Sequence, residues 1–228
     1  VAGAPPDAGL EPPAPAPDME TMRAFARPLG ASAYLEEDLP NGLKAIVGAR
    51  RGLPVVTVGV SFRTGESAAL GADRLTAMLA EPQVTTKVLP GQFGAAYWEQ
   101  RRKDDLRYFM SGSSGNVADM LALLSEWISG MKVGSWSADF FKREVLASVG
   151  AAEQWPEAQA RRDFWSILYP SHLYGRTALA ADLAKLDAGK ANDWITATHT
   201  GGSATMVVIG EIDEEAVMAA IRSTFGGL

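Results

Sequence analysis

Apolar residues recur along the chain with two spacings, and each spacing predicts a different element. An apolar residue at every second position predicts a half-buried strand, and this pattern occurs in 54–63 and 106–113. A further extended segment, 96–102, precedes the second of these and is expected to pair with it as a hairpin. Residues 205–209 form a continuous apolar run, which is typical of a strand that is buried on both faces.

An Asn-Gly turn at Asn41 and Gly42 separates two more extended segments, 34–39 and 43–49. Asn-Gly is a strong hairpin signal, because both residues tolerate the positive φ angles of a tight turn. A second turn at 50–53 leads into the next strand. We therefore expect the first three strands to pair one after another in an antiparallel sheet.

Apolar residues at three- and four-residue intervals predict the helices. The clearest case is 116–129, for which Asn116 is a candidate N-cap and Gly130 a candidate C-cap. Ser137 is a candidate N-cap for a long helix, which Pro156 is expected to interrupt. The other helices are expected at 18–29, 70–81, 158–168, 180–186, 188–198 and 214–225.

Large apolar side chains in these helices are expected to pack in a core. In the helix at 158–168 these are Phe164, Trp165 and Leu168, and core-like spacing also holds for the Trp residues Trp127, Trp136, Trp155, Trp165 and Trp194. The order of elements predicts an α+β fold, a two-layer domain with a mostly antiparallel mixed sheet and helices packed on one face. We assign this domain to residues 19–228.

The first eighteen residues differ in composition from the rest. Residues 1–18 are rich in Pro, Ala and Gly, a composition that buries little apolar surface and predicts a disordered tether. The sequence begins with Val1 in place of Met, and no signal peptide is visible. A tether behind a trimmed start fits an exported protein, periplasmic or associated with the envelope.

Composition and charge exclude several kinds of function. The chain has 228 residues, of which 47% are hydrophobic and 21% charged, as in ordinary globular domains. Its net charge of -6 argues against nucleic acid or anionic membrane as the main partner. The absence of Cys excludes disulfides, thiolate metal sites and Cys nucleophiles. No apolar run is long enough for a transmembrane segment.

Four short motifs follow one another at intervals that match a known family. They lie at 39–43 (Leu-Pro-Asn-Gly-Leu), at 54–56 with 65–67, at 171–176 (Ser-His-Leu-Tyr-Gly-Arg) and at 207–213 (Val-Val-Ile-Gly-Glu-Ile-Asp). Together they resemble one half of the pitrilysin, insulinase and mitochondrial processing peptidase family of inverted zinc metallopeptidases. The resemblance covers residues 35–228. It implies that a second homologous half lies on another chain or beyond this sequence.

The same resemblance implies where a zinc site would lie. Members of the family carry an H-x-x-E-H motif on the helix predicted here at 70–81, in which the two His bind zinc and the Glu activates a water. These three positions fall on Arg74, Ala77 and Met78, and none of these side chains can take the required role. No His occurs before residue 172, and Ser148 or Val149 stands near the expected ligand Glu. We therefore expect no cofactor in this chain, and zinc only in a partner subunit.

The stretches at 67–71 (Ser-Ala-Ala-Leu-Gly) and 75–79 (Leu-Thr-Ala-Met-Leu) resemble the non-catalytic members of bacterial two-component versions of the family. This resemblance implies a catalytically inactive homologue, a pseudoenzyme that acts as the peptide-binding or structural partner of a zinc-bearing peptidase subunit. Two alternatives stay open. One is a chamber-forming subunit of an active heteromeric zinc metalloendopeptidase, and the other is a free-standing envelope protein that binds peptides or acts as a scaffold.

In the family, a peptide adds to an edge strand of the sheet, and 97–102 occupies that place in this sequence. Trp98, Arg101 and Arg102 are therefore the candidate peptide contacts. The two His residues, His172 and His199, are too few for a zinc site of three or four ligands. We expect each of them to form a structural hydrogen bond.

Overall fold

The computed structural model describes residues 34–65, 90–177, 180–185 and 187–228. All of these residues belong to one unit, Tyr34–Leu228. The tether predicted at 1–18, the domain boundary at residue 19 and the helices expected at 18–29 and 70–81 lie outside the described residues.

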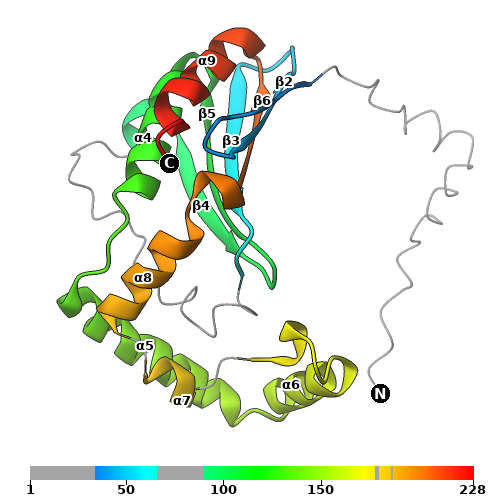
Figure 1. Ribbon diagram of the computed structural model, residues 1–228, viewed down its shortest axis with the longest axis vertical. Coiled ribbons are helices and arrows are strands. Elements are labelled where there is room, and N and C mark those ends of the chain that lie inside the picture. Colours follow the sequence, from blue (N-terminus) through cyan, green and yellow to red (C-terminus); the bar gives the residue numbers. More distant parts are fainter. Residues whose placement is uncertain (1–33, 66–89, 178–179, 186) are drawn as a thin grey trace, which may run out of the picture. The chain divides into compact units, whose positions relative to one another are not determined.

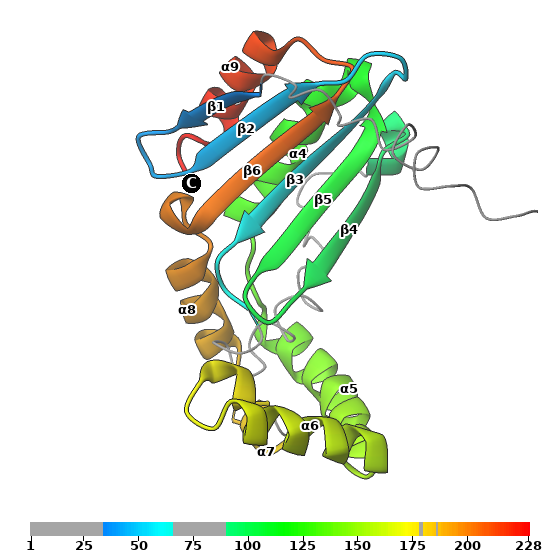
Figure 2. The ribbon, with the colours of Figure 1, turned by 90° about the vertical axis from the view of Figure 1, so that its right-hand side faces the viewer.

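A six-stranded sheet forms one layer of the domain (Figure 2). Its strands are β1 (Leu35–Asp38), β2 (Lys44–Ala49), β3 (Val55–Phe62), β4 (Ala96–Arg101), β5 (Leu106–Ser113) and β6 (Ala204–Gly210). They lie in the order β1-β2-β6-β3-β5-β4. The pairing of β2 with β6 is parallel and the other pairings are antiparallel. The prediction of a mostly antiparallel mixed sheet is therefore confirmed.

Both predicted hairpins are present, and local turn chemistry explains them. Between β1 and β2, Gly42 has a φ of 89°, a conformation that favours glycine. The Asn41 side chain holds this turn, since its Oδ1 accepts a hydrogen bond from the Leu43 N–H at 3.2 Å. Between β4 and β5, the Arg102 N–H donates to the Asp105 carbonyl at 2.9 Å, which closes a tight turn.

Sequential pairing of the first three strands was a wrong prediction, because β6 lies between β2 and β3. The turn at 50–53 joins β2 to β3, yet Val58 pairs with Val208 and not with a residue of β2. A central position gives the apolar β6 two hydrogen-bonded neighbours. Burial of β6 on both faces was also a wrong prediction. Its burial alternates, and Ile209 is 38% exposed, because the helices cover the other face.

Two helices cover the buried face of the sheet, namely α4 (Val117–Ser129) and α9 (Glu214–Phe225) (Figure 2). Asp213 caps α9 by accepting a hydrogen bond from the Ala216 N–H at 2.9 Å. Ser125 of α4 donates to the Thr224 carbonyl of α9 at 2.7 Å. The fully buried side chains of this core come from both layers and include Val58, Phe62, Leu106, Tyr108, Met110, Met120, Leu121, Met206, Met218, Ile221 and Phe225.

The other helices follow α4 along the chain (Figure 1): α5 (Ser135–Glu153), α6 (Pro156–Leu168), α7 (Ala180–Leu183) and α8 (Ala188–Thr198). The prediction of Ser137 as the N-cap is wrong, because α5 begins at Ser135 with Gly134 as its N-cap. The interruption at Pro156 is confirmed. Proline lacks the N–H that a helix interior needs but suits a first turn, so it begins α6. Short 3-10 turns occur at Pro90–Phe93, Ser114–Asn116, Leu173–Gly175 and Gly201–Ser203.

Helix α6 contradicts the prediction that its large apolar side chains face inward. Phe164 is 58% exposed and Leu168 is 53% exposed, and no residue of α6 is buried. Trp155, just before α6, is exposed as well, whereas Trp127 and Trp194 pack against the core as predicted. Helical spacing shows that apolar side chains share a face, but it does not show what covers that face. The side chain of Trp136 lies outside the described residues.

None of the described helices combines the length and the apolar character that a bilayer-spanning helix needs.

Candidate functional site

The zinc-motif positions inferred from the sequence, Arg74, Ala77 and Met78, lie outside the described residues. Ser148 and Val149 lie on α5, and Val149 is buried against Leu183 of α7. Within the residues that the structure describes, no group of three or more His, Asp or Glu side chains is arranged to hold a metal ion.

Both histidines form structural hydrogen bonds, as predicted. The Nδ1 of His172 accepts a hydrogen bond from the Tyr174 N–H at 3.1 Å in the loop after α6. His199 is 7% exposed, and its Nε2 lies 2.8 Å from the hydroxyl of Tyr108 in the core. Burial lowers the pKa of the His199 imidazole to about 4 and outweighs the opposing effect of its backbone hydrogen bond with Ile195.

Among the described strands, β4 has a neighbour on one side only, and that neighbour is β5. Trp98 pairs with Phe109 in register, and the two rings stack with centroids 5.3 Å apart. The Tyr97 ring lies on the opposite face, 5.1 Å from the ring of Trp127 on α4. Burial is the main cause that raises the pKa of the Tyr97 hydroxyl, and the neighbouring Glu99 raises it further. The edge strand is thus fixed to the core on one face and exposes Trp98 on the other.

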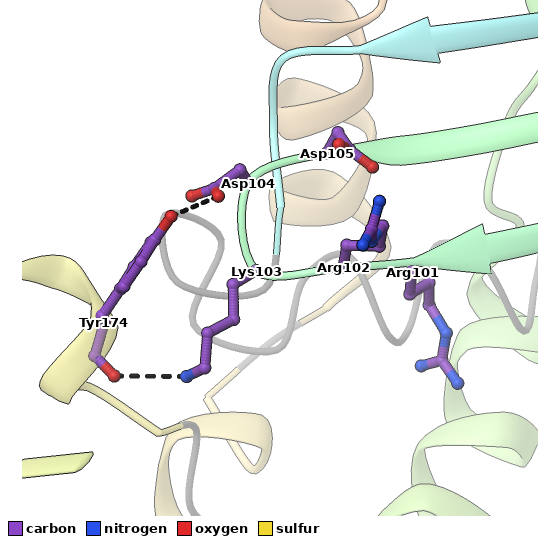
Figure 3. Close-up of a pocket in the computed structure, with 6 residues that line it drawn as sticks. All are labelled: Arg101, Arg102, Lys103, Asp104, Asp105 and Tyr174. Atoms are coloured by element: carbon purple, nitrogen blue, oxygen red, sulfur yellow. Dashed lines mark hydrogen bonds between the residues drawn. The ribbon is translucent and has the colours of Figure 1, made fainter. Parts of the chain in front are cut away.

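A charged cavity of about 570 Å³ lies at the end of β4 and at the turn to β5 (Figure 3). Six residues line it: Arg101, Arg102, Lys103, Asp104, Asp105 and Tyr174. This arrangement brings two of the predicted contacts, Arg101 and Arg102, to the same end of the strand. Trp98 lies on β4 itself, outside the cavity lining.

Two residues from the helical region hold the turn in place. The Tyr174 hydroxyl donates a hydrogen bond to the Asp104 carboxylate, and this bond is the main cause that raises the pKa of Tyr174. Lys103 donates from Nζ to the Tyr174 carbonyl at 3.2 Å and lies 4.6 Å from the ring centre of Trp165. The prediction from sequence did not include Tyr174 or Trp165 in the site. Tyr174 lies in the 171–176 motif, so the motif itself was the available signal.

Comparison with known proteins gives structural matches alone. No family model matches the sequence, and no curated protein matches it. Among solved structures, a protease from Helicobacter pylori matches with a TM-score of 0.79 and 17% identity, over 86% of this chain and 51% of that one. The peptidase M16 inactive domain from Pseudomonas fluorescens matches with a TM-score of 0.77 and 19% identity, over 86% and 50%. The chain has the M16 peptidase fold.

A third structure with the M16 fold adds information about length. The periplasmic protease PqqL from Escherichia coli matches with a TM-score of 0.72 and 17% identity, over 86% of this chain and 24% of that one. The present chain therefore spans half of the first two structures and a quarter of PqqL. The resemblance to one half of a pitrilysin-type peptidase is confirmed at the level of the fold.

Proposed function

We propose that this chain is a catalytically inactive M16 peptidase homologue that acts as the partner of a zinc-bearing peptidase subunit. The observation that carries the proposal is in the sequence. The H-x-x-E-H motif needs two His residues four positions apart, but the His residues here stand at 172 and 199. The chain therefore cannot contain the motif in any register. The match to an inactive M16 domain from Pseudomonas fluorescens supports this reading.

Helix α6 supplies a surface for the partner subunit. Ile167 is 78% exposed, and Phe164 and Leu168 lie near it on the same helix with more than half of their surface accessible. Exposed apolar patches of this kind mark protein interfaces. Because the chain spans half of the first solved structures that it matches, we propose a second M16-type domain as the occupant of this surface.

The edge of β4 supplies the peptide-binding part of the proposal. A strand with a neighbour on one side presents backbone N–H and C=O groups to which an extended peptide can add. Trp98, on the face away from the helices, offers an aromatic surface to the side chains of such a peptide. We further propose that the protein works outside the cytoplasm. The composition of residues 1–18 and the periplasmic location of PqqL support this.

Zinc analysis and peptide cleavage test the proposed role. The purified chain should hold no stoichiometric zinc and should not cleave a quenched-fluorescence peptide library. The chain, tagged and expressed in its source cells, should recover a zinc-bearing M16 homologue. The recovered pair should cleave peptides, and a chelator should abolish the cleavage. Stoichiometric zinc in the isolated chain together with cleavage by it alone would refute the proposal.

The partner surface has its own test. Ile167→Asp places a charge in the centre of the exposed α6 patch and should abolish recovery of the zinc-bearing subunit while the chain stays folded. Leu53→Asp is the matched control, because Leu53 is 73% exposed in the turn between β2 and β3. Equal recovery with both variants would show that the partner binds elsewhere.

A further inference from the structure

The cationic side chains at the end of β4 exceed the carboxylates beside them. Arg107 already neutralises Asp105, because its Nε and one terminal guanidinium nitrogen donate to the two carboxylate oxygens at 2.7 and 2.8 Å. Asp104 accepts the hydrogen bond of Tyr174 and stands as the second acidic group of the cavity. The lining also contains three cations, Arg101, Arg102 and Lys103. The cavity therefore carries a net positive charge, although the net charge of the whole chain is -6.

Arg101 and Arg102 are the cations that can receive a ligand. Lys103 is engaged by the Tyr174 carbonyl and lies over the Trp165 ring. Within the described residues, no ion pair engages Arg101 or Arg102, and both are exposed. Figure 3 shows the Arg101 side chain extending past β4 on the side away from β5. This is the side on which an added strand would lie.

The register of the hairpin shows which backbone groups face outward. The Arg102 N–H donates to the Asp105 carbonyl, so Arg102 belongs to a hydrogen-bonded pair of the ladder. Such pairs alternate with pairs whose backbone groups point away from the partner strand. By this alternation, the N–H and C=O groups of Tyr97, Glu99 and Arg101 point to the outer edge of β4. The Glu99 carboxylate, two residues before Arg101, is hydrogen-bonded to the Tyr97 side chain.

We propose that the β4 edge selects extended peptides that carry a carboxylate at the Arg101–Arg102 end. This inference rests on the proposed peptide-binding role and names the chemical class of the peptide. Backbone hydrogen bonds along β4 hold the peptide irrespective of its sequence. Arg101 and Arg102 are consecutive residues and their side chains diverge (Figure 3), so each guanidinium group can bind a peptide carboxylate on its own side, for which its planar donor pair is well suited. The carboxylate comes either from an Asp or Glu side chain or from the C-terminus of the peptide.

Fluorescence anisotropy with labelled octapeptides tests this selection on the 228-residue chain. Three amidated peptides share an alternating Val-Thr body and end in two Glu, two Gln or two Lys residues, and a fourth ends in two Gln with a free C-terminus. At low salt, the Glu peptide should bind about tenfold more tightly than the amidated Gln peptide, and the Lys peptide should bind more weakly. Tighter binding of the free-acid Gln peptide would identify the C-terminus as a source of the carboxylate.

The variant R101A/R102A should lower the affinity of the Glu peptide to that of the Gln peptide and leave the Gln peptide unchanged. R51A removes an exposed Arg from the distant turn between β2 and β3 and should change neither affinity. R101K/R102K should keep part of the preference, since it keeps the charge.

Equal affinity of the wild-type chain for the Glu and Gln peptides, or an unchanged preference in R101A/R102A, would overturn the proposal. So would failure of all four peptides to bind. None of these results would restore zinc or cleavage to the isolated chain. The failure of the inference is therefore distinguishable from the failure of the non-catalytic role.

Discussion

Acidification should destabilise the fold through one buried imidazole, that of His199. The Thr198 hydroxyl donates its proton to the Trp194 carbonyl at 2.6 Å. The Thr198 hydroxyl oxygen therefore accepts a hydrogen bond from the Nδ1 of His199 at 3.0 Å. Nε2 then accepts a hydrogen bond from the Tyr108 hydroxyl at 2.8 Å. These partners satisfy a neutral imidazole with its proton on Nδ1. A proton added to Nε2 would place an uncompensated charge among the core residues.

The sign and size of the effect follow from the pKa values. An unfolded His has a pKa near 6.5, whereas burial lowers the pKa of folded His199 to about 4. Above pH 6.5 the residue is neutral in both states and has no effect. As the pH falls from 6.5 to 4, the unfolded state binds a proton that the folded state does not, so stability is lost. The loss is about 2 kcal/mol at pH 5 and roughly 3 kcal/mol below pH 4.

Urea unfolding at several pH values measures this loss, with His199→Gln as the reference that cannot titrate. The difference in unfolding free energy between wild type and variant should shrink by about 2 kcal/mol between pH 7.5 and pH 5. A difference that stays constant over this range would refute the reasoning. An NMR titration of the wild type gives an independent check, because a His199 midpoint above pH 6 would contradict the lowered pKa.

Two further substitutions test the β3–β6 pair and the contact between the first turn and α9. Gly210→Ala would place a Cβ against the Val55 carbonyl oxygen in the β3–β6 pair, so we expect a loss of about 2 kcal/mol or more in the free energy of urea unfolding. Gly227→Ala, with open space around it, should be neutral. Asn41→Ala removes the amide that donates to the Phe225 carbonyl at 2.8 Å and should cost about 1–3 kcal/mol in the same assay. Wild-type stability in Asn41→Ala would show that this contact between the first turn and α9 contributes little.

Elements governed by nearby residues were predictable from the sequence. Helix α9 (Glu214–Phe225) matches its prediction in full, because Asp213 and the apolar spacing are local signals. The position of β6 was not predictable from local patterns, because its pairing joins residues as distant as Val58 and Val208. The exposure of α6 was missed for a similar reason, since spacing along a helix carries no information about the surface opposite it.

The candidate site divides in the same way. The extended segment at 96–102 and its charges were evident from the sequence, and the resemblance placed that segment at the edge of the sheet. The contact of Tyr174 with Asp104 spans 70 positions, so local spacing does not indicate it, and the motif at 171–176 was the signal that could have drawn attention to Tyr174. The binding role of Trp98, Arg101 and Arg102 stays a prediction, as does the loss of the zinc motif at Arg74, Ala77 and Met78.

The central position of β6 has a consequence for how the protein emerges from the ribosome. Strands β1 and β2 form one hairpin and β3, β4 and β5 form a second group, and all five are translated long before Ala204. Until β6 is synthesised, the facing edges of β2 and β3 lack their native neighbour, and α9, which covers the core, comes later still. Unpaired edges of this kind favour pairing between chains. We therefore expect a nascent chain arrested before Ala204 to depend on chaperones and to aggregate when released.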